Sequence, residues 1–204
     1  MDVSQERSAR IVELAARIGA IMRDGDSVAA LEAAKALLNG FAAQRHLFPA
    51  AEFPWPAPPE DSHCYCLYRD GALALYLDLL RQGTDTVPHD HGDSWAIVTS
   101  IDGVERHHLY QVEAAQDGPG PATLRKAGQI EIAPGQSVSL RIGGIHAIEA
   151  VGSEPAMMLH CYGRGFEDQA GRLEYDLAAG TRSHSIAAAG EIEDYPLHPA
   201  VAGR

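Results

Sequence analysis

Apolar residues near the start of the chain recur at helical spacing. Between residues 11 and 22 they stand at positions 11, 14, 15, 18, 21 and 22, and a polar RDGD segment follows. Spacing of three and four residues places such side chains on one face of an α-helix. A second amphipathic run begins after Asp26 and Ser27, either of which can cap a helix. We expect this second helix to end at Asn39 and Gly40, since glycine permits a left-handed closing residue.

The pattern changes from residue 48 onward. The segment 48–60 holds five prolines, which disfavour both helix and central strand and predict an extended linker. Short apolar runs separated by Gly, Pro and Asp then continue to about residue 165, and they predict strands. The candidate strands are HCYCLYR, ALALYLDLL, WAIVTSI, ERHHLYQV, QIEIA, SVSLRI, HAIEAV and AMMLHCY, with a surface loop at 117–122 and a tight turn at 133–136.

Many short strands joined by short turns favour a closed β-barrel or jelly roll over a parallel α/β sheet. The chain after the last strand mixes a possible hairpin, GRLEYDLAAGTR, with a tail rich in Gly and Ala. We therefore divide the chain into four parts. They are an N-terminal helical segment (1–47), a Pro-rich linker (48–61), the barrel (62–165) and a C-terminal hairpin and tail (166–204).

Composition narrows the class of protein. The 204 residues carry 16 Lys and Arg against 28 Asp and Glu, a formal net charge of −12, which disfavours nucleic acid and acidic membranes as partners. Three cysteines without a C-x-x-C spacing fit a reducing, cytoplasmic setting. The N-terminus lacks the apolar core of a signal peptide, and GALALYLDLL is too short to span a bilayer. We expect a cytoplasmic monomer or small homo-oligomer that acts on a small molecule.

Two histidines one residue apart are the strongest chemical signal. In an extended chain, His89 and His91 of VPHDHGDSW leave the same face and can bind one ion. The pair gains weight from its frame, because Gly83 precedes His89 by six positions and Gly143 precedes His146 by three.

This frame resembles the two-part motif of the cupin superfamily, G-x5-H-x-H-x4-E-x6-G followed by G-x2-H-x3-N. The chain departs from it at Ala96, where the superfamily has Glu, and at Ala150, where it has Asn. The matching residues are Gly83, His89, His91, Gly103, Gly143 and His146. The resemblance implies a mainly β fold, the cupin double-stranded β-helix or jelly-roll barrel, here preceded by N-terminal helices.

The missing glutamate changes the predicted chemistry. Three neutral imidazoles leave a divalent ion its full charge, so that it attracts anionic ligands and deprotonates a coordinated thiol. Three ligands on one face of an octahedral ion leave room for a bidentate substrate and dioxygen, as in non-haem iron(II) oxygenases.

The second motif and its continuation, GGIHAIEAVGSEPAMMLHCYG, resemble the thiol dioxygenase family, which includes cysteine dioxygenase type I and the mercaptopropionate dioxygenases. His160 and Tyr162 stand where that family has its H-x-Y pair, and two residues apart on a strand they share a face. The resemblance implies an Fe(II) enzyme that oxidises a small thiol with O2 to a sulfinate. Two alternatives remain open, a zinc or nickel cupin acting as a hydrolase or isomerase, and a non-catalytic ligand-binding cupin.

Two departures from the family affect details. Met158 occupies the place of the family's Ser, so a Ser-His-Tyr relay has at most two members here. Ala96 cannot form the thioether that a Cys in this position forms with the Tyr of animal cysteine dioxygenases. Cys161 faces the opposite side of its strand from Tyr162 and is expected to be buried.

A small thiol acid needs a cation to bind its carboxylate, and arginine is the usual choice because its guanidinium pairs with both carboxylate oxygens. In cysteine dioxygenases this Arg precedes the first motif, whereas the mercaptopropionate dioxygenases use one shortly after the Tyr, where Arg164 and Arg172 stand here. We therefore predict a preference for 3-mercaptopropionate or a related thiol acid over cysteine. His107 and His108 face opposite sides of a strand, and we predict that they lie at the surface or rim.

Overall fold

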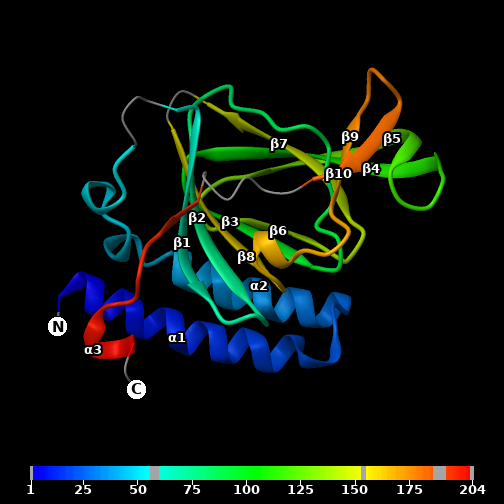
Figure 1. Ribbon diagram of the computed structural model, residues 1–204. Coiled ribbons are helices and arrows are strands. Elements are labelled where there is room, and N and C mark those ends of the chain that lie inside the picture. Colours follow the sequence, from blue (N-terminus) through cyan, green and yellow to red (C-terminus); the bar gives the residue numbers. More distant parts are fainter. Residues whose placement is uncertain (1, 56–59, 153–154, 186–191, 203–204) are drawn as a thin grey trace.

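The computed structural model describes residues 2–55, 60–152, 155–185 and 192–202, and it begins with the two predicted helices (Figure 1). Helix α1 spans Val3–Ile21 and α2 spans Val28–Ala42. Ser27 caps α2, since its side chain accepts a hydrogen bond from the amide of Ala30 at 3.2 Å. The expected end at Gly40 is wrong, because α2 continues through the buried Phe41 and Ala42. Packing of this last apolar turn outweighs the weak helix propensity of glycine.

Eleven strands within the described residues form two sheets. The first sheet has the order β11-β1-β2-β8-β3-β6, and the second has the order β7-β4-β5-β10-β9. The bounds are β1 Ser62–Arg69, β2 Ala74–Leu80, β3 Ala96–Asp102, β4 Val104–Ala115, β5 Gly120–Ile132, β6 Ser137–Leu140, β7 Ile145–Val151, β8 Ala156–Tyr162, β9 Leu173–Asp176, β10 Thr181–His184 and β11 Ile192–Asp194.

The two sheets lie face to face and enclose the barrel interior (Figure 1). This is a double-stranded β-helix with N-terminal helices, so the predicted fold class is confirmed. The eight predicted strands and the C-terminal hairpin, β9 with β10, are present. The predicted loop at 117–122 is partly wrong, since residues 120–122 belong to β5, and Gly120 and Pro121 pair with β10.

Strand alternation separates a helix-side core from the barrel interior. In β2, Leu75, Leu77 and Leu79 pack with the helices on the outer face of the first sheet, whereas Tyr76 belongs to an interior cluster. In β8, Cys161 packs on the helix side and Tyr162 faces inward, as predicted. Because both faces are covered, the apolar run of β2 is nearly continuous. This arrangement leaves the inner face free to carry polar side chains.

The ends of the chain meet beside α1. Arg7, which is buried, donates hydrogen bonds of 2.7 Å to the carbonyl of Leu47, to Glu52 and to the hydroxyl of Tyr195. Short helices η1 Met22–Asp24, η2 Arg45–Leu47, η3 Ala50–Glu52, η4 Phe166–Asp168 and α3 Pro199–Ala202 complete the described elements. Residues 56–59 of the predicted linker and 186–191 and 203–204 of the predicted tail lie outside the described residues.

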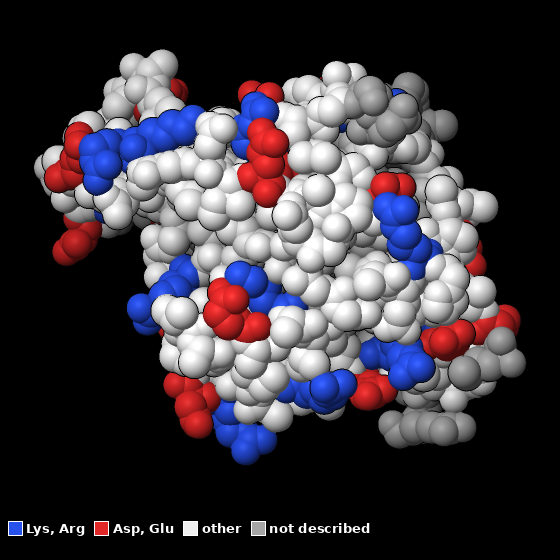
Figure 2. Space-filling model, turned by 180° about the vertical axis from the view of Figure 1, so that it is seen from behind, with Lys and Arg blue, Asp and Glu red and all other residues white. Residues whose placement is uncertain are grey.

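The face of the molecule opposite the view of Figure 1 carries basic side chains next to acidic ones (Figure 2). The ion pairs among the described residues include Arg106 with Glu131 at 2.7 Å and with Glu149 at 2.9 Å. The basic residues are therefore interspersed with acidic ones on this face. In the part of the chain that the structure describes, no helix is long and apolar enough to cross a membrane.

Candidate metal centre and its cavity

The structure brings His89, His91 and His146 together inside the barrel. His89 and His91 lie in the segment 81–95 between β2 and β3, and His146 is the second residue of β7. Two backbone hydrogen bonds join the segments, from His89 N to His146 O at 2.8 Å and from His146 N to His89 O at 3.0 Å. One nitrogen from each ring lies within 4.8 Å of the other two, and all three residues are buried. The three rings can thus face one ion.

The free nitrogens of these rings suit a divalent metal ion. Nδ1 of His89 lies 2.9 Å from the carbonyl of Val87, which leaves its Nε2 for a ligand. Both ring nitrogens of His91 and Nε2 of His146 are buried without a hydrogen-bond partner, a costly state that a metal would relieve. Burial lowers the pKa of His89 to about 3 and holds the pKa values of His91 and His146 well below the ordinary range. The rings are therefore neutral near pH 7, which is the form that binds metals.

The residue between the first two histidines anchors their loop. The carboxylate of Asp90 accepts hydrogen bonds from the amides of Gly92 and Leu173, both at 3.0 Å, and lies 3.2 Å from the hydroxyl of Tyr175. Gly92 has a φ of +58°, and a Cβ there would lie 2.2 Å from the carbonyl oxygen of Ala170. Only glycine fits this close approach.

His107 lies in the barrel interior, so its predicted place at the surface or rim is wrong. His107 and Glu105 occupy the inner face of β4 and are each 0% exposed. Nδ1 of His107 is 2.9 Å from Nδ1 of His146, and Nε2 of His107 is 2.7 Å from Oε1 of Glu105. His108 points to the other side, as predicted. In VERHHLY, polar residues occupy both alternating sets of strand positions, so the sequence does not show which set faces the interior.

A second polar group adjoins the three histidines from β8 and β2. Nδ1 of His160 lies 2.8 Å from the hydroxyl of Tyr162, and Nε2 of His160 lies 3.3 Å from Oδ2 of Asp78. The ring of Tyr162 is 5.2 Å from that of His91. Burial raises the pKa of Tyr162 well above its ordinary value and also raises the pKa of Asp78.

The predicted two-membered relay therefore has a third neighbour that the sequence did not reveal. Asp78 on β2 is the cross-strand partner of Met158, the residue at the place of the family's Ser. The acidic group reaches His160 from the adjacent strand. No motif spacing indicates such a contact, since it depends on strand register.

A cavity of about 580 Å³ opens onto these groups. Of the two candidate arginines, Arg172 is among its described lining residues and Arg164 is not. Arg172 lines it together with His89, His146, His160 and Tyr162. Nε and Nη1 of Arg172 are buried and have no hydrogen-bond partner, and the guanidinium carbon lies 5.4 Å from the ring centre of Phe166. Arg164, in contrast, is 47% exposed, pairs with Asp93 at 2.9 Å and is not among the described residues that line the cavity.

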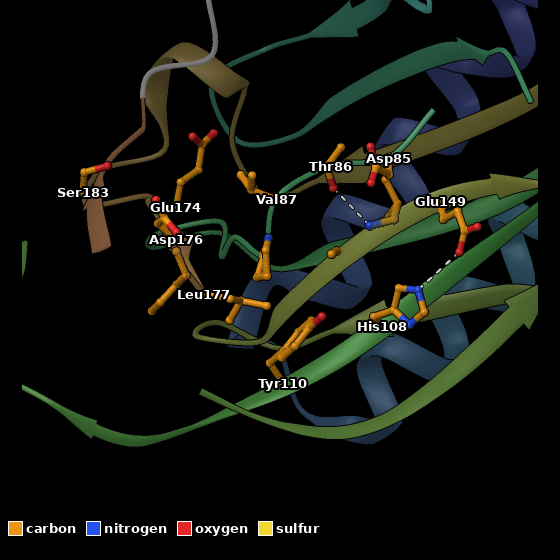
Figure 3. A pocket seen from close by; sticks show the side chains of 14 residues that line it. Asp85, Thr86, Val87, His108, Tyr110, Glu149, Glu174, Asp176, Leu177 and Ser183 are labelled. Carbon is orange, nitrogen blue, oxygen red and sulfur yellow. Dashed lines mark hydrogen bonds and ion pairs between the residues drawn. The ribbon is translucent and has the colours of Figure 1, made fainter. Parts of the chain in front are cut away.

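A neighbouring hollow of about 550 Å³ is lined by residues of the segment 85–88 and of β4, β7, β9 and β10 (Figure 3). His108 points into it and lies 3.4 Å from the carboxylate of Glu149. Thr86 and Ile148, which are joined by a hydrogen bond of 3.0 Å, border both hollows. The two adjacent histidines of β4 therefore point to opposite sides, His108 toward this hollow and His107 into the barrel interior.

No protein-family model matches the chain, and no curated protein matches it. The architecture described above is that of a double-stranded β-helix. Similar solved structures include a double-stranded β-helix protein from Klebsiella pneumoniae, with 19% identity over 62% of this chain and 88% of that one and a TM-score of 0.43. The DMSP lyase DddQ from Ruegeria pomeroyi has 20% identity over 52% of this chain and a TM-score of 0.38. An oxalate oxidase has 15% identity over 58% of this chain and a TM-score of 0.41. The aligned part of this chain spans 47% of the DddQ chain and 59% of the oxalate oxidase chain.

Proposed function

We propose that the protein is an iron(II)-dependent thiol dioxygenase that acts on a small thiol acid such as 3-mercaptopropionate. The observation that carries the proposal is the guanidinium of the partly buried Arg172, whose Nε and Nη1 are buried without a hydrogen-bond partner in the same cavity as the candidate metal ligands His89 and His146. Buried N–H donors of a cation that lack an acceptor are costly, so the site is suited to an anionic ligand. The reaction is RSH + O2 → RSO2H, in which sulfur is oxidised by four electrons and both oxygen atoms enter the product.

The cavity offers two separate attachment points for such a substrate. Arg172 can pair with the carboxylate through two parallel hydrogen bonds. Bound iron(II), held by His89, His91 and His146, would supply a Lewis-acidic centre for the thiolate and dioxygen. All three side chains are neutral, so these ligands leave the positive charge of a bound ion uncompensated and available to anionic ligands. Binding at both ends orients the thiol relative to the metal centre.

Tyr162 would assist the reaction with a proton. Its raised pKa keeps the hydroxyl protonated, and its ring contacts that of His91. A phenol in this position can donate a hydrogen bond to oxygen or sulfur as negative charge develops there. His160 orients the hydroxyl if its Nδ1–H donates to the phenol oxygen, which leaves the phenol proton for the substrate, and Asp78 lies 3.3 Å from its Nε2. We assign Tyr162 as a catalytic residue and His160 and Asp78 as positioning residues.

Anaerobic purification followed by metal analysis and oxygen uptake tests the proposal. We expect iron, one O2 consumed per thiol, and a sulfinate that carries both labelled atoms when ¹⁸O2 is supplied. We also expect a higher kcat/KM for 3-mercaptopropionate than for cysteine, and a low value for cysteamine, which lacks a carboxylate. Zinc or nickel without oxygen uptake would instead support hydrolysis or isomerisation, and absence of metal would support a ligand-binding role. A higher kcat/KM for cysteine would overturn the substrate assignment alone.

A further inference from the structure

We propose that Glu105 and His107 are positioning residues for the metal centre, which they would tune through the ligand His146. This inference rests on the metal site of the proposed function but not on its reaction. The three side chains form a continuous chain inside the barrel, with separations of 2.7 Å between Glu105 and His107 and 2.9 Å between His107 and His146. Their exposed fractions are 0%, 0% and 1%. Water therefore does not compete for these contacts.

The contact between the two imidazoles selects one tautomer for each ring. Two nitrogens at 2.9 Å require a proton between them, because two lone pairs would repel. Nε2 of His146 is the buried nitrogen without a partner, so it is the atom available to a metal. Nδ1 of His146 then carries the proton and donates it to Nδ1 of His107. The remaining proton of His107 consequently sits on Nε2, which lies 2.7 Å from Oε1 of Glu105 but is not aligned with it as a hydrogen bond.

The orientation of the rings fits this assignment. The planes of His107 and His146 differ by only 13°, and their centres are 5.1 Å apart. With the two nitrogens at 2.9 Å, the rings meet at their edges rather than face to face. His107 therefore restricts rotation of His146 and keeps Nε2 directed at the other two ligands.

Glu105 also supplies charge that the ligands themselves lack. Ala96 stands where the superfamily motif has its glutamate, and the three imidazoles are neutral. Among the described residues, no Lys or Arg forms an ion pair with Glu105, and its near contact is Nε2 of His107, which is neutral in the tautomer assigned above. A buried carboxylate in this state is costly, and a divalent cation beyond His146 would offset that cost. Carboxylate–histidine–metal chains of this kind orient the ligand and raise its basicity.

Metal titration by calorimetry, with Co(II) as the probe and with the full chain freed of metal, tests this inference. We expect Glu105→Gln, which keeps the volume but removes the charge, to weaken Co(II) binding about ten- to a hundredfold. His107→Asn is expected to act similarly. His108→Asn is the matched control, since the adjacent histidine lines the other hollow, and its Kd should equal that of the unmodified protein.

A second measurement separates this role from a purely structural one. Because Glu105→Gln removes a buried charge, the Tm of its metal-free form should stay constant or rise while metal affinity falls. A Kd that does not change in Glu105→Gln overturns the inference, as does an equal loss of affinity in His108→Asn. If the unmodified protein binds neither Co(II) nor Fe(II), the metal site itself fails. Metal binding without thiol oxidation would remove the proposed reaction and leave this inference standing.

Discussion

His89 and His146 are joined by a pair of backbone hydrogen bonds of 2.8 and 3.0 Å, although they belong to different motifs. The backbone thus brings the two halves of the candidate metal site together without help from their side chains. The imidazoles themselves add buried nitrogens that lack partners, such as Nε2 of His146. Loss of one ring should therefore affect metal binding more than folding.

We expect His89→Ala, His91→Ala and His146→Ala each to abolish iron binding. Two remaining imidazoles cannot complete the three-ligand set on which this site depends. Circular dichroism should show an unchanged barrel, because the backbone pairing between the motifs remains. Iron content by elemental analysis is the measurement. Full occupancy in any one of the variants would contradict the ligand assignment.

Tyr162→Phe should lower kcat by about ten- to a thousandfold, the effect of one lost transition-state donor. The ring and its contacts with His91 and Phe166 are retained in this variant, so the change isolates the hydroxyl.

The intact mass of the unmodified protein should equal the mass calculated from its sequence without a crosslink, because Ala96, the cross-strand partner of Tyr162, has no sulfur. A mass deficit of two hydrogens mapped to Tyr162 would contradict this.

Asp78→Asn should lower kcat for the thiol while leaving KM within about twofold, since Asp78 would act on Tyr162 through His160 and not on the carboxylate of the substrate. Steady-state oxygen uptake at varied thiol concentrations separates kcat from KM, and the measurement is repeated over a range of pH values. Met158→Ser in the Asp78→Asn background places a hydroxyl at the family's relay position and should restore part of kcat. If Asp78→Asn matches the parent protein in kcat at every pH, Asp78 has no part in the relay.

Arg172→Gln should raise KM for 3-mercaptopropionate about ten- to a hundredfold, the effect of losing a charged hydrogen bond. Arg164→Gln is the matched control, because Arg164 is exposed and pairs with Asp93. Its kinetics should stay close to those of the parent. Oxygen uptake with cysteamine, which has no carboxylate, should be insensitive to either change. A larger effect from Arg164→Gln would reverse the assignment.

The metal-free protein should lose stability as the pH falls below 6.5. Burial lowers the pKa of His89 from its ordinary 6.5 to about 3, so in this window the unfolded state binds a proton that the folded state excludes. The free energy of unfolding then decreases with falling pH, by about 1 kcal/mol between pH 6.5 and 5.5 for each such histidine. Urea unfolding at the two pH values measures this. His89→Gln should reduce the decrease, and an unchanged decrease in that variant would contradict the expectation.

The sequence by itself determined the barrel and the three candidate ligands. Alternating strands and short turns depend on local periodicity, and the H-x-H pair shares a face because successive side chains of an extended chain alternate. The cupin frame of Gly83, Gly143 and His146 then linked the two motifs. These features lie within a few residues of one another or follow a known spacing, so they could be read along the chain.

Only the tertiary structure decided which other polar groups reach the site. Asp78 meets His160 through the register between β2 and β8, and Glu105 and His107 turn inward because β4 pairs with β7. The sequence does not distinguish Arg164 from Arg172 as the carboxylate partner. In the structure, Arg164 pairs with Asp93, whereas Arg172 lines the cavity. Burial and cross-strand contacts depend on how distant segments pack, and a one-residue change of register would turn each of these strand side chains to the opposite face.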